Sequence, residues 1–381
     1  MSTPGSPRLR RLDARQLDRA DRESWSALAD RAVEPNPFFR PEFALANMAD
    51  RGVPLELLVV ADDAAWLACL PIRRRSASLR VPIRSIEAMT DDYSFLGTPL
   101  LDRDRVDRGA DGLMALVASI RSEGVLVVGA WAPDGPVAAA ITRAATRRGM
   151  RPVVLSAVRR AAWHRSSDGR SPGARLPGDD RKKLASRARH LAEALGGELR
   201  VVDRSQDPGA VDAFLEMENS GWKAERGNPM AARPGDARFF RRMAAEMGAT
   251  GRFELLALEG GDRTVAMETH LIDGDALYSF KIAHDPAFRA YSPGTQLKAH
   301  VMDRLEERGF RIADSCASPG NAHMNRLWPD QRPLQVLLIP TGAISGRLVR
   351  PLVAARSMAR AARERFRSRG GDAKARAQVT P

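Results

Sequence analysis

Short apolar runs separated by turn residues dominate the second half of the chain, and their lengths predict strands. Apolar and β-branched residues fill 253–258, 264–272 and 276–283, and the Asp273-Gly274-Asp275 sequence between the last two runs predicts a tight hairpin. Further strands are expected over 198–202, 311–315 and 334–338, and helices over 210–226, 236–247, from Ser292 onward, and over 321–327. The pattern predicts a sheet flanked by helices.

The first half repeats this alternation. Strands are expected over 55–61, 66–72, 79–83, 125–131 and 152–156, and helices over 14–32, 41–51, 105–123 and 136–149. The two halves also share a loop, which reads Tyr93-Ser-Phe-Leu-Gly97-Thr-Pro-Leu100 in the first and Tyr291-Ser-Pro-Gly294-Thr-Gln-Leu297 in the second. We therefore expect an α/β fold of two tandem lobes, each with a mixed, largely antiparallel sheet.

The helix start at Ser292 is the feature most informative about chemistry. The first backbone N–H groups of a helix lack partners inside it and point outward with the positive end of the dipole. Ser292 is predicted to be the N-cap, Pro293 the first helical residue, and Gly294 leaves room for an anion to approach the amides. Such a start often only ends a loop. In the first half Pro99, Asp102 and Asp104 interrupt the equivalent position, so we expect that lobe to be degenerate.

Several motifs resemble the CelD-like acetyltransferase family, which is associated with cellulose biosynthesis and belongs to the GNAT superfamily. The motifs are Trp25 to Leu28, Asn36 to Phe43, Glu218 to Lys223 with Gly227, Tyr278 to Lys281 with Asp285, Tyr291 to Leu297, Gly309 to Asp314, and Gly320 to Trp328. The resemblance spans roughly residues 20–340, is distantly Fem-like, and implies that the loop before the Ser292 helix holds the pyrophosphate of an acyl-CoA. Acetyl-CoA or another acyl-CoA is the implied co-substrate.

The implied reaction is acyl transfer from the thioester to an amine, which needs proton transfer and a polarised carbonyl but no covalent nucleophile. Strand alternation predicts that Glu268 and His270 share one strand face, as do Ser279 and Lys281 on the next strand. Asp314 ends the strand after the Ser292 helix and is the leading candidate for general base or acceptor orienter. The alternatives are His323, His270 and Glu268.

Two further groups of residues complete the expected site. The donor is expected to contact Tyr291, Ser292, Gly294, Thr295 and Lys281, although Lys281 could instead bridge to Asp285. The acceptor cleft is expected to contain Trp222, Lys223 and Asn325, although Trp222 could simply pack. Relatives commonly carry a Tyr-Lys pair where this chain has Met324-Asn325, which puts a functional lysine there in doubt.

Composition narrows the class of protein. The chain has 381 residues, 44% of them hydrophobic, without an apolar run of about 18 residues or a signal-peptide core. Cys69 and Cys316 lack metal or redox spacing, so no metal is expected and Cys316 reads as a buried small residue rather than a nucleophile. A cytoplasmic protein is expected.

The net charge of +13 is concentrated in two segments. Residues 159–190 contain eight Arg and two Lys against three acids, and residues 344–381 contain nine Arg and one Lys against two. The first segment predicts either a solvated linker or a surface that attracts an anionic substrate. The second predicts a basic amphipathic helix that contacts anionic lipid, or a frayed extension. Nucleic acid is not expected, because the body of the protein is not basic.

The expected domains are a first lobe over 1–158, a basic linker over 159–180, an acyltransferase lobe over 181–342 and a basic tail over 343–381. The expected function is acyl-CoA-dependent N-acyl transfer to a small molecule or an envelope or polysaccharide precursor. One alternative is a Fem-like transferase that uses aminoacyl-tRNA. The other is a non-catalytic protein of polysaccharide assembly.

Overall fold

The computed structural model describes residues 6–77, 83–120, 122–165, 178–220, 229–328, 330–342 and 351. The first lobe contains β1 (Arg8–Asp13), η1 (Ala14–Gln16), α1 (Arg19–Asp30), η2 (Pro37–Phe39), α2 (Pro41–Arg51), β2 (Glu56–Ala61), β3 (Trp66–Arg75), β4 (Ser85–Ala88), β5 (Leu100–Leu101), α3 (Val106–Ser119), β6 (Val125–Trp131) and α4 (Pro136–Arg147). Half of these elements, namely α2, β2, β3, α3, β6 and α4, were predicted within a few residues, whereas β4 and β5 were not predicted.

The second lobe follows a long strand, β7 (Val153–His164). It contains α5 (Gly178–Leu195), β8 (Leu199–Asp203), α6 (Ala210–Ser220), η4 (Met230–Ala232), α8 (Pro234–Gly248), β9 (Phe253–Gly260), β10 (Arg263–Asp273), β11 (Ala276–His284), η5 (Pro286–Tyr291), α9 (Pro293–Asp303), β12 (Ile312–Asp314) and α10 (Ala322–Leu327). The last described strand is β13 (Asp330–Pro340). The hairpin turn between β10 and β11 is the one predicted at Asp273-Gly274-Asp275.

Within the described residues, thirteen strands form one sheet in the order β1-β2-β3-β4-β6-β13-β7-β12-β11-β10-β9-β8, with β5 paired to β3. Each lobe has one parallel pair, β4 with β6 and β11 with β12, and in each a helix connects the two strands. The remaining pairs are antiparallel. The predicted mixed, largely antiparallel α/β fold with two tandem lobes is confirmed.

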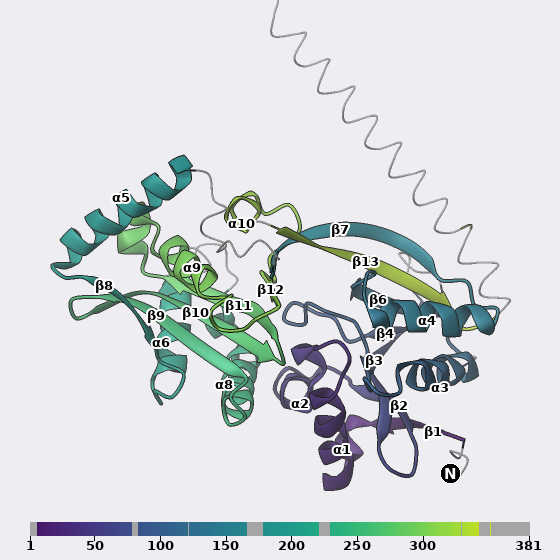
Figure 1. Cartoon of the computed structure of the whole chain (residues 1–381). Helices are drawn as coiled ribbons and strands as arrows, with labels where there is room; N and C mark the ends of the chain where they lie inside the picture. The colour runs from purple at the N-terminus through teal and green to yellow at the C-terminus, as the bar shows by residue number, and fades with distance from the viewer. Residues whose placement is uncertain are drawn as a thin grey trace, which may run out of the picture.

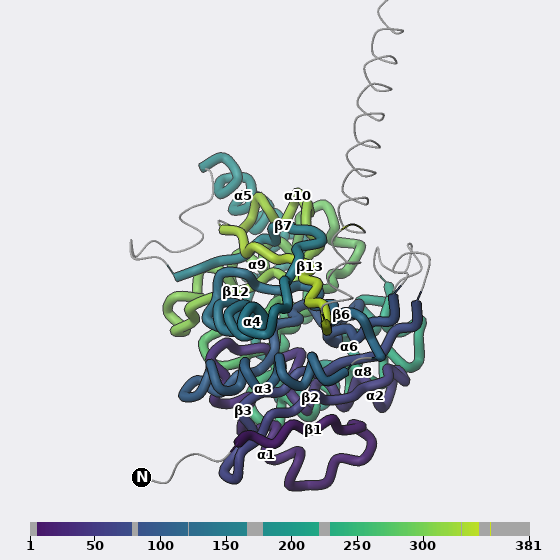
Figure 2. Tube along the Cα trace, turned by 90° about the vertical axis from the view of Figure 1, so that its right-hand side faces the viewer, coloured from purple at the N-terminus to yellow at the C-terminus, as the bar shows by residue number. Residues whose placement is uncertain are grey.

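The two lobes share strands. β13 lies between β6 of the first lobe and β7, while the end of β7 pairs with β12 of the second lobe. Figures 1 and 2 show β7 and β13 side by side where the lobes meet. The basic linker was expected to begin at residue 159, but 159–164 belong to β7, because this part of the strand pairs with β13 and β12.

Helices cover both faces of the second lobe's sheet. α9 contacts β9, β10 and β11 and is flanked by α5, whereas α6 and α8 contact β11 and β9. Figure 1 shows α5 and α9 on one side of these strands and α6 and α8 on the other. In the first lobe α3 packs on β1, β2 and β3 and against α4. The site described below lies on the α9 side.

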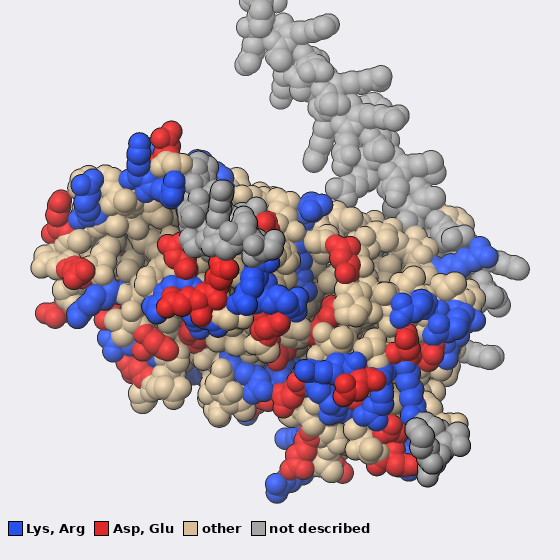
Figure 3. Space-filling model, in the orientation of Figure 1, with Lys and Arg blue, Asp and Glu red and all other residues tan. Residues whose placement is uncertain are grey.

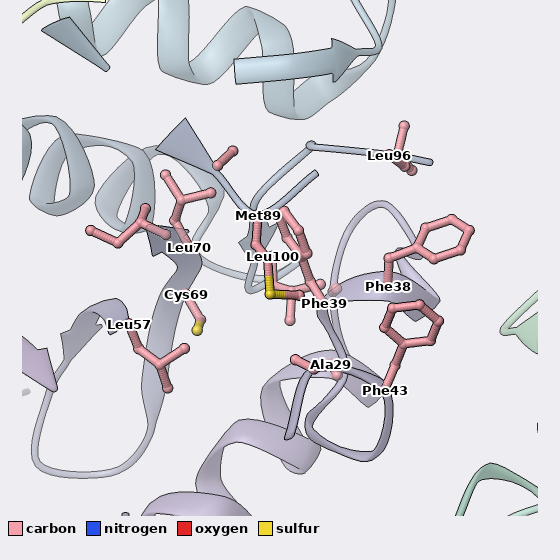
Figure 4. Close-up of a cluster of buried hydrophobic side chains, with 14 of the residues drawn as sticks. Ala29, Phe38, Phe39, Phe43, Leu57, Cys69, Leu70, Met89, Leu96 and Leu100 are labelled. Carbon is pink, nitrogen blue, oxygen red and sulfur yellow. The ribbon is translucent and has the colours of Figure 1, made fainter. Parts of the chain in front are cut away.

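The hydrophobic core is continuous between the lobes. One cluster joins apolar residues of the first lobe to the α6–α8 side of the second, and a separate cluster lies beneath α9. Aromatic rings meet at the junction, where Phe43 of α2 lies 5.2 Å from Phe239 and 6.0 Å from Phe280 between ring centroids. Figure 4 shows the first lobe's core, in which Cys69 lies among apolar side chains. The lobes are therefore packed as one body.

Some of the predicted secondary structure differs from the structure or lies outside the described residues. The predicted helix over 14–32 begins later, because Asp18 caps α1 with a hydrogen bond from Asp21 N–H and leaves only a short 3-10 turn before it. β1 was not predicted, since its sequence RLRRLD contains few apolar residues. The strand expected over 79–83 lies mostly outside the described residues, and so does the basic tail.

Charge is dispersed over the surface. Figure 3 shows acidic and basic side chains interspersed on the face drawn, in agreement with the prediction that the body is not basic. Among the described residues, no helix is long and apolar enough to cross a bilayer. The same residues contain no group of three or more His, Cys, Asp or Glu side chains arranged to hold a metal ion.

Candidate functional site

An opening in the sheet lies between β11 and β12. The two strands pair only from Ala276 with Ile312 to Tyr278 with Asp314, and β11 then continues to His284 without β12. The chain passes from β11 through η5 into α9, which returns across the sheet toward β12. The start of α9 therefore stands beside the part of β11 that has lost its parallel neighbour, a position at which α/β folds commonly bind ligands.

The start of α9 differs from the predicted capped form. Ser292 occupies the N-cap position with φ 56° and ψ 51°, and its side chain does not cap the helix. Its hydroxyl instead accepts a hydrogen bond from Arg187 of α5 at 3.0 Å. The prediction that Ser292 caps the helix is wrong because left-handed backbone turns this side chain away from the first amides. Pro293 does begin the helix, as expected.

Gly294 and Thr295 form the first turn of α9. A Cβ on Gly294 would lie 3.3 Å from Ile282 Cδ1 of β11, so the helix start and the strand approach closely at this residue. Thr295 Oγ1 lies 3.2 Å from His323 Nε2 on α10. Thus Ser292, Gly294, Thr295 and His323, which were predicted separately as donor-binding and catalytic residues, are brought together in the folded chain.

α5 runs alongside this helix. Gln296 of α9 donates to the backbone carbonyl of Leu184 at 3.0 Å, and a groove of about 1130 Å³ separates α5 from β8 and the rest of α9. Arg181 lines the groove, while Lys182 and Lys183 are exposed to solvent. The described basic residues of α5, within the basic segment 159–190, therefore lie along α9, and Arg187 reaches its start, where positive charge can act on an anion.

A line of alternating charges is buried beneath α9. Lys298 of α9 donates to Glu268 of β10 and, at 2.8 Å, to the hydroxyl of Ser279 on β11. His270 lies between two carboxylates, with Nε2 3.4 Å from Glu268 Oε1 and Nδ1 2.9 Å from Glu254 Oε2. Glu268 and His270 share a strand face, as predicted.

Burial and ion pairing shift the pKa values of these buried residues in opposite directions. Glu268 is 1% exposed, yet the ammonium of Lys298 and the imidazole of His270 lower its pKa to about 2 despite desolvation. Burial opposes the charge of His270, but the two carboxylates raise its pKa. At the surface end of this line of charges, Arg308 binds Glu254. Arg308 and His270 together lower the pKa of the Glu254 carboxylate, although desolvation opposes this shift. The line is therefore a chain of ions, each stabilised by the next.

A β-bulge separates two residues that were expected to lie together. The register of β10 and β11 shifts between Thr269 and His270, so that His270 faces Ser279 while Thr269 faces Lys281. Lys281 consequently lies on the opposite face from Ser279, with its Nζ 4.4 Å from the ring centroid of Tyr93. The prediction that Ser279 and Lys281 share a face is wrong, because the alternation breaks at the bulge.

Asp314 is buried and fully engaged. Its Oδ2 accepts from Arg160 at 2.6 Å and Arg332 at 3.0 Å, and its Oδ1 accepts from the N–H of Cys316. These partners lower the pKa of Asp314 against the effect of burial, so the arrangement favours a structural anion over a general base. Burial raises the pKa of the Cys316 thiol, in line with a buried small residue.

The remaining predicted residues contribute less. Trp222 and Lys223 lie outside the described residues. Asn325 is exposed on α10, and Tyr291 is half-buried at the end of η5, where its ring packs near Phe288. Sequence reasoning missed Lys298. The available signal was a lysine next to Leu297 on the inward face of α9, beside the apolar positions that the helix period places in the core.

Ion pairs precede the equivalent helix of the first lobe. Asp102, which has no exposed side-chain surface, lies in the loop just before α3 and pairs with Arg31 at 3.0 Å and Arg105 at 2.7 Å. It also accepts a hydrogen bond from the N–H of Asp104. These ion pairs hold the loop that precedes α3, whereas Arg105 occupies the N-cap position of that helix without a side-chain cap.

Comparison with known proteins agrees with this geometry. Residues 178–325 match the family described as "Acetyltransferase (GNAT) domain", a segment that includes β11, α9, β12 and the buried charges. No curated protein sequence matches the chain.

Solved structures share the fold at low identity. A crystal structure of FemX is 10% identical, with a TM-score of 0.58 over 84% of this chain and 95% of that chain. L-PGS from Bacillus licheniformis is 11% identical, with a TM-score of 0.52 over 87% of this chain and 96% of that one. The C-terminal domain of a putative lysylphosphatidylglycerol synthetase from Agrobacterium fabrum is 14% identical, with a TM-score of 0.52 over 87% and 95%. Residues 178–325, which contain the start of α9 and the parted strands, therefore match a GNAT acetyltransferase domain in sequence, and the solved structures show a similar fold.

Proposed function

We propose that the second lobe transfers an acyl group directly from an acyl-CoA thioester to an amine, as in the CelD-like family that the sequence resembles. The observation that carries the proposal is the match of residues 178–325 to an acetyltransferase domain whose α9 begins beside the opening between β11 and β12. In the reaction, the amine nitrogen attacks the thioester carbon, the C–S bond breaks, the amine loses a proton and the thiolate gains one.

The donor is proposed to bind with its pyrophosphate at the start of α9. The dipole of this helix favours an anion, and Gly294 carries no side chain that would keep phosphate oxygens from the backbone. Arg187 and the exposed lysines of α5 supply positive charge nearby. Ser292, Thr295 and Tyr291 remain proposed contacts, whereas Lys281 is omitted because it faces the first lobe.

His323 is the proposed proton-transfer group. It lies on α10 beside Thr295, at the surface. Partial desolvation of the ring and the charge of Lys298 lower the pKa of His323. The imidazole is therefore neutral near pH 7 and can accept a proton. Glu268 suits this role less, since a carboxylate with a pKa of about 2 is a weak base. Lys298 is proposed to stabilise negative charge on the thioester oxygen during the reaction.

Donor binding is the first test. Acetyl-CoA should raise the melting temperature of the full chain in a concentration-dependent manner, and S-acetylpantetheine, which lacks the pyrophosphate, should raise it much less. A panel of longer acyl-CoA donors in the same assay would define the acyl length. Equal stabilisation by both compounds, or none by any acyl-CoA, would contradict the proposed pyrophosphate site.

The role of His323 has its own test. His323→Gln should lower the rate of thiol release at least about 100-fold and remove the acidic limb of the pH profile of kcat/KM, because no group is left to take up the proton. The KM for acetyl-CoA should change little. A variant that retains its rate and its pH profile would show that another group transfers the proton.

The similar fold of FemX keeps a second candidate function, the transfer of an aminoacyl group from aminoacyl-tRNA that the Fem-like resemblance of the sequence implies. The face drawn in Figure 3, on which acidic and basic side chains are interspersed, does not provide the basic surface that tRNA binding needs. Stabilisation by charged tRNA but not by acetyl-CoA would select this candidate over the first.

The acceptor class and the cellular location complete the proposal. We propose a small-molecule or envelope-precursor amine as the acceptor and a cytoplasmic protein whose first lobe is inactive. The basic segment 344–381 is proposed to contact anionic lipid at the membrane surface. Co-sedimentation with phosphatidylglycerol vesicles, with and without this segment, tests the last point, and recruitment without any response to acyl donors would support a non-catalytic role.

A further inference from the structure

A cavity of about 870 Å³ lies between the lobes, on the other side of the paired part of β11 and β12 from the start of α9. The first lobe contributes the segment after α1, including Glu34, and the turn before α4, including Asp134. The second lobe contributes the β10–β11 hairpin with Asp273, and Tyr278 at the last paired position of β11. A volume of this size accommodates a small organic molecule.

The basic side chains that line this cavity already have acceptors. Arg252 pairs with Asp30, Arg311 with Asp275, Arg332 with Asp314, and Arg103 donates to the carbonyls of Asp30 and Arg31. His164, which also lines the cavity, has a pKa lowered by burial and is neutral near pH 7. An anionic ligand would therefore have to break existing pairs to gain a partner.

The carboxylates are in the opposite situation. Asp273 is 3% exposed, and Arg40 donates to its Oδ1 at 3.0 Å. Its Oδ2 is buried and lacks a hydrogen bond of ordinary geometry from the described residues, although the N–H of Asn36 and the charge of Arg252 also stabilise this carboxylate. Glu34 accepts the N–H of Val137 on Oε1 at 2.8 Å, and none of the described residues hydrogen-bonds its Oε2. Asp134 is exposed at the rim without an ion pair in the described part of the chain.

Burial affects both inner carboxylates. Desolvation raises the pKa of Asp273 to about 6 even though Arg40 opposes it, and desolvation is also the largest influence raising the pKa of Glu34. An ionised carboxylate that lacks a full set of partners in a buried site gains most from a ligand that supplies positive charge and N–H donors.

We propose that this cavity binds the ammonium group of an amine ligand between Glu34 of the first lobe and Asp273 of the second. Resting on the proposed acyl transfer, the ligand is the amine acceptor, held on the side of the strand pair opposite to the donor. Tyr278 and Arg332 connect the two sites, since both line the cavity and Arg332 binds Asp314 where the strands part. The first lobe thereby supplies half of the acceptor site.

Binding of matched compounds to the full chain tests this proposal. The probes are 1,4-diaminobutane against 1,4-butanediol, and glucosamine against glucose, measured by ligand-observed NMR at pH 7.5 without an acyl donor. In at least one pair, the ammonium compound should bind at least tenfold more tightly than its neutral partner. Equal binding within both pairs, or no binding of either ammonium compound, overturns the proposal.

Two conservative variants locate the site. Glu34→Gln and Asp273→Asn each keep an oxygen that accepts the existing hydrogen bond from Val137 or Arg40 but remove the charge, so each should weaken ammonium binding at least fivefold. Asp111→Asn, on the exposed face of α3 where Asp111 pairs with Arg147 and Arg148, is the matched control and should bind like the wild type. Because Glu34 is only half-buried, the Glu34→Gln variant should fold normally and still test the site if the Asp273→Asn variant folds poorly. Unchanged binding by Glu34→Gln overturns the site.

Acetyl-CoA binding separates this inference from the proposed function. If acetyl-CoA binds and no ammonium compound does, the acceptor site is wrong and acyl transfer stands. If ammonium compounds bind through Glu34 and acetyl-CoA does not, the cavity stands and the donor assignment is wrong. The two variants should retain the wild-type affinity for acetyl-CoA, because neither residue lies near α9.

Discussion

The two lobes have the same parallel strand pair joined by a helix, but the starts of these helices are occupied differently. In the first lobe the buried carboxylate of Asp102 lies in the loop just before α3 and is fixed by two arginines. In the second lobe Arg187 contacts Ser292 just before α9, and no carboxylate takes the equivalent position among the described residues. The same architecture therefore places an acidic side chain just before the helix in the first lobe and a basic contact just before it in the second.

The two helices, α3 and α9, also differ in the charge of the side chains that they bury. α3 buries Gly109, Ala110, Gly112, Leu113, Met114, Leu116 and Val117, all without charge. α9 buries Lys298, which is held by Glu268 and linked through His270 to Glu254. Buried ions stabilise a fold no better than apolar side chains of the same volume. The two lobes therefore differ in the polarity of the interior beneath this helix.

The largest expected effect comes from breaking the buried ions of the second lobe. Glu268→Ala should lower the free energy of unfolding by about 3–5 kcal/mol, because it leaves Lys298 and His270 without their shared carboxylate. Urea denaturation measures the change. The double variant Glu268→Leu with Lys298→Met makes this interior apolar like that of the first lobe and should recover much of the loss. A single variant that loses less than about 1 kcal/mol would show that the ions are not coupled.

The pH dependence of stability follows from the same carboxylate. The folded pKa of Glu268, about 2, lies below the 4.5 of an unperturbed glutamate, so its contribution to stability is fully present above pH 4.5 and is lost as the pH falls toward 2. That contribution amounts to about 3 kcal/mol. Guanidinium unfolding between pH 5 and pH 3 should therefore show a steeper loss in the wild type than in the Glu268→Leu, Lys298→Met variant. Parallel curves would contradict the lowered pKa.

Adding an acidic side chain at the helix start of the second lobe should make it resemble the first. Gly294→Glu introduces a carboxylate and places a Cβ 3.3 Å from Ile282, so the affinity for acetyl-CoA should fall at least about tenfold, or about 1.4 kcal/mol. Isothermal titration calorimetry measures this loss. Gly209→Glu, just before α6, adds the same charge at a helix start outside the site and should bind normally. Equal losses in both variants would indicate a general effect of charge.

The smallest expected effect concerns α5. Arg187→Gln removes a positive charge beside Ser292 and should weaken acetyl-CoA binding about two- to fivefold at low salt, with the difference shrinking as salt screens the remaining charges. The triple change of Arg181, Lys182 and Lys183 to Gln should act in the same direction. Affinities that do not depend on these charges at low salt would remove α5 from the donor site.

The sequence predicts most of the local structure of the second lobe and the residue at which α9 begins, but not how that start is capped. Periodicity identifies α9, and the turn residues Asp273-Gly274-Asp275 locate the hairpin, because both signals depend on neighbouring residues. Contacts between distant segments are not visible in the same way. The pairing of Asp314 with Arg160 joins residues 154 positions apart and changes the reading of the leading catalytic candidate. The bulge that turns Lys281 away from Ser279 likewise depends on the partner strand.

Because β13 lies between β6 and β7, β6 gains its neighbouring strand only after most of the chain has been synthesised. β6 leaves the ribosome roughly 200 residues before β13, so at about 5–20 residues per second its edge waits about 10–40 s for its neighbour. Until then the apolar strand β6 presents unpaired backbone groups that other chains could extend. The first lobe is thus the earliest part to be made and among the last to be completed, and its folding depends on the final strand of its neighbour.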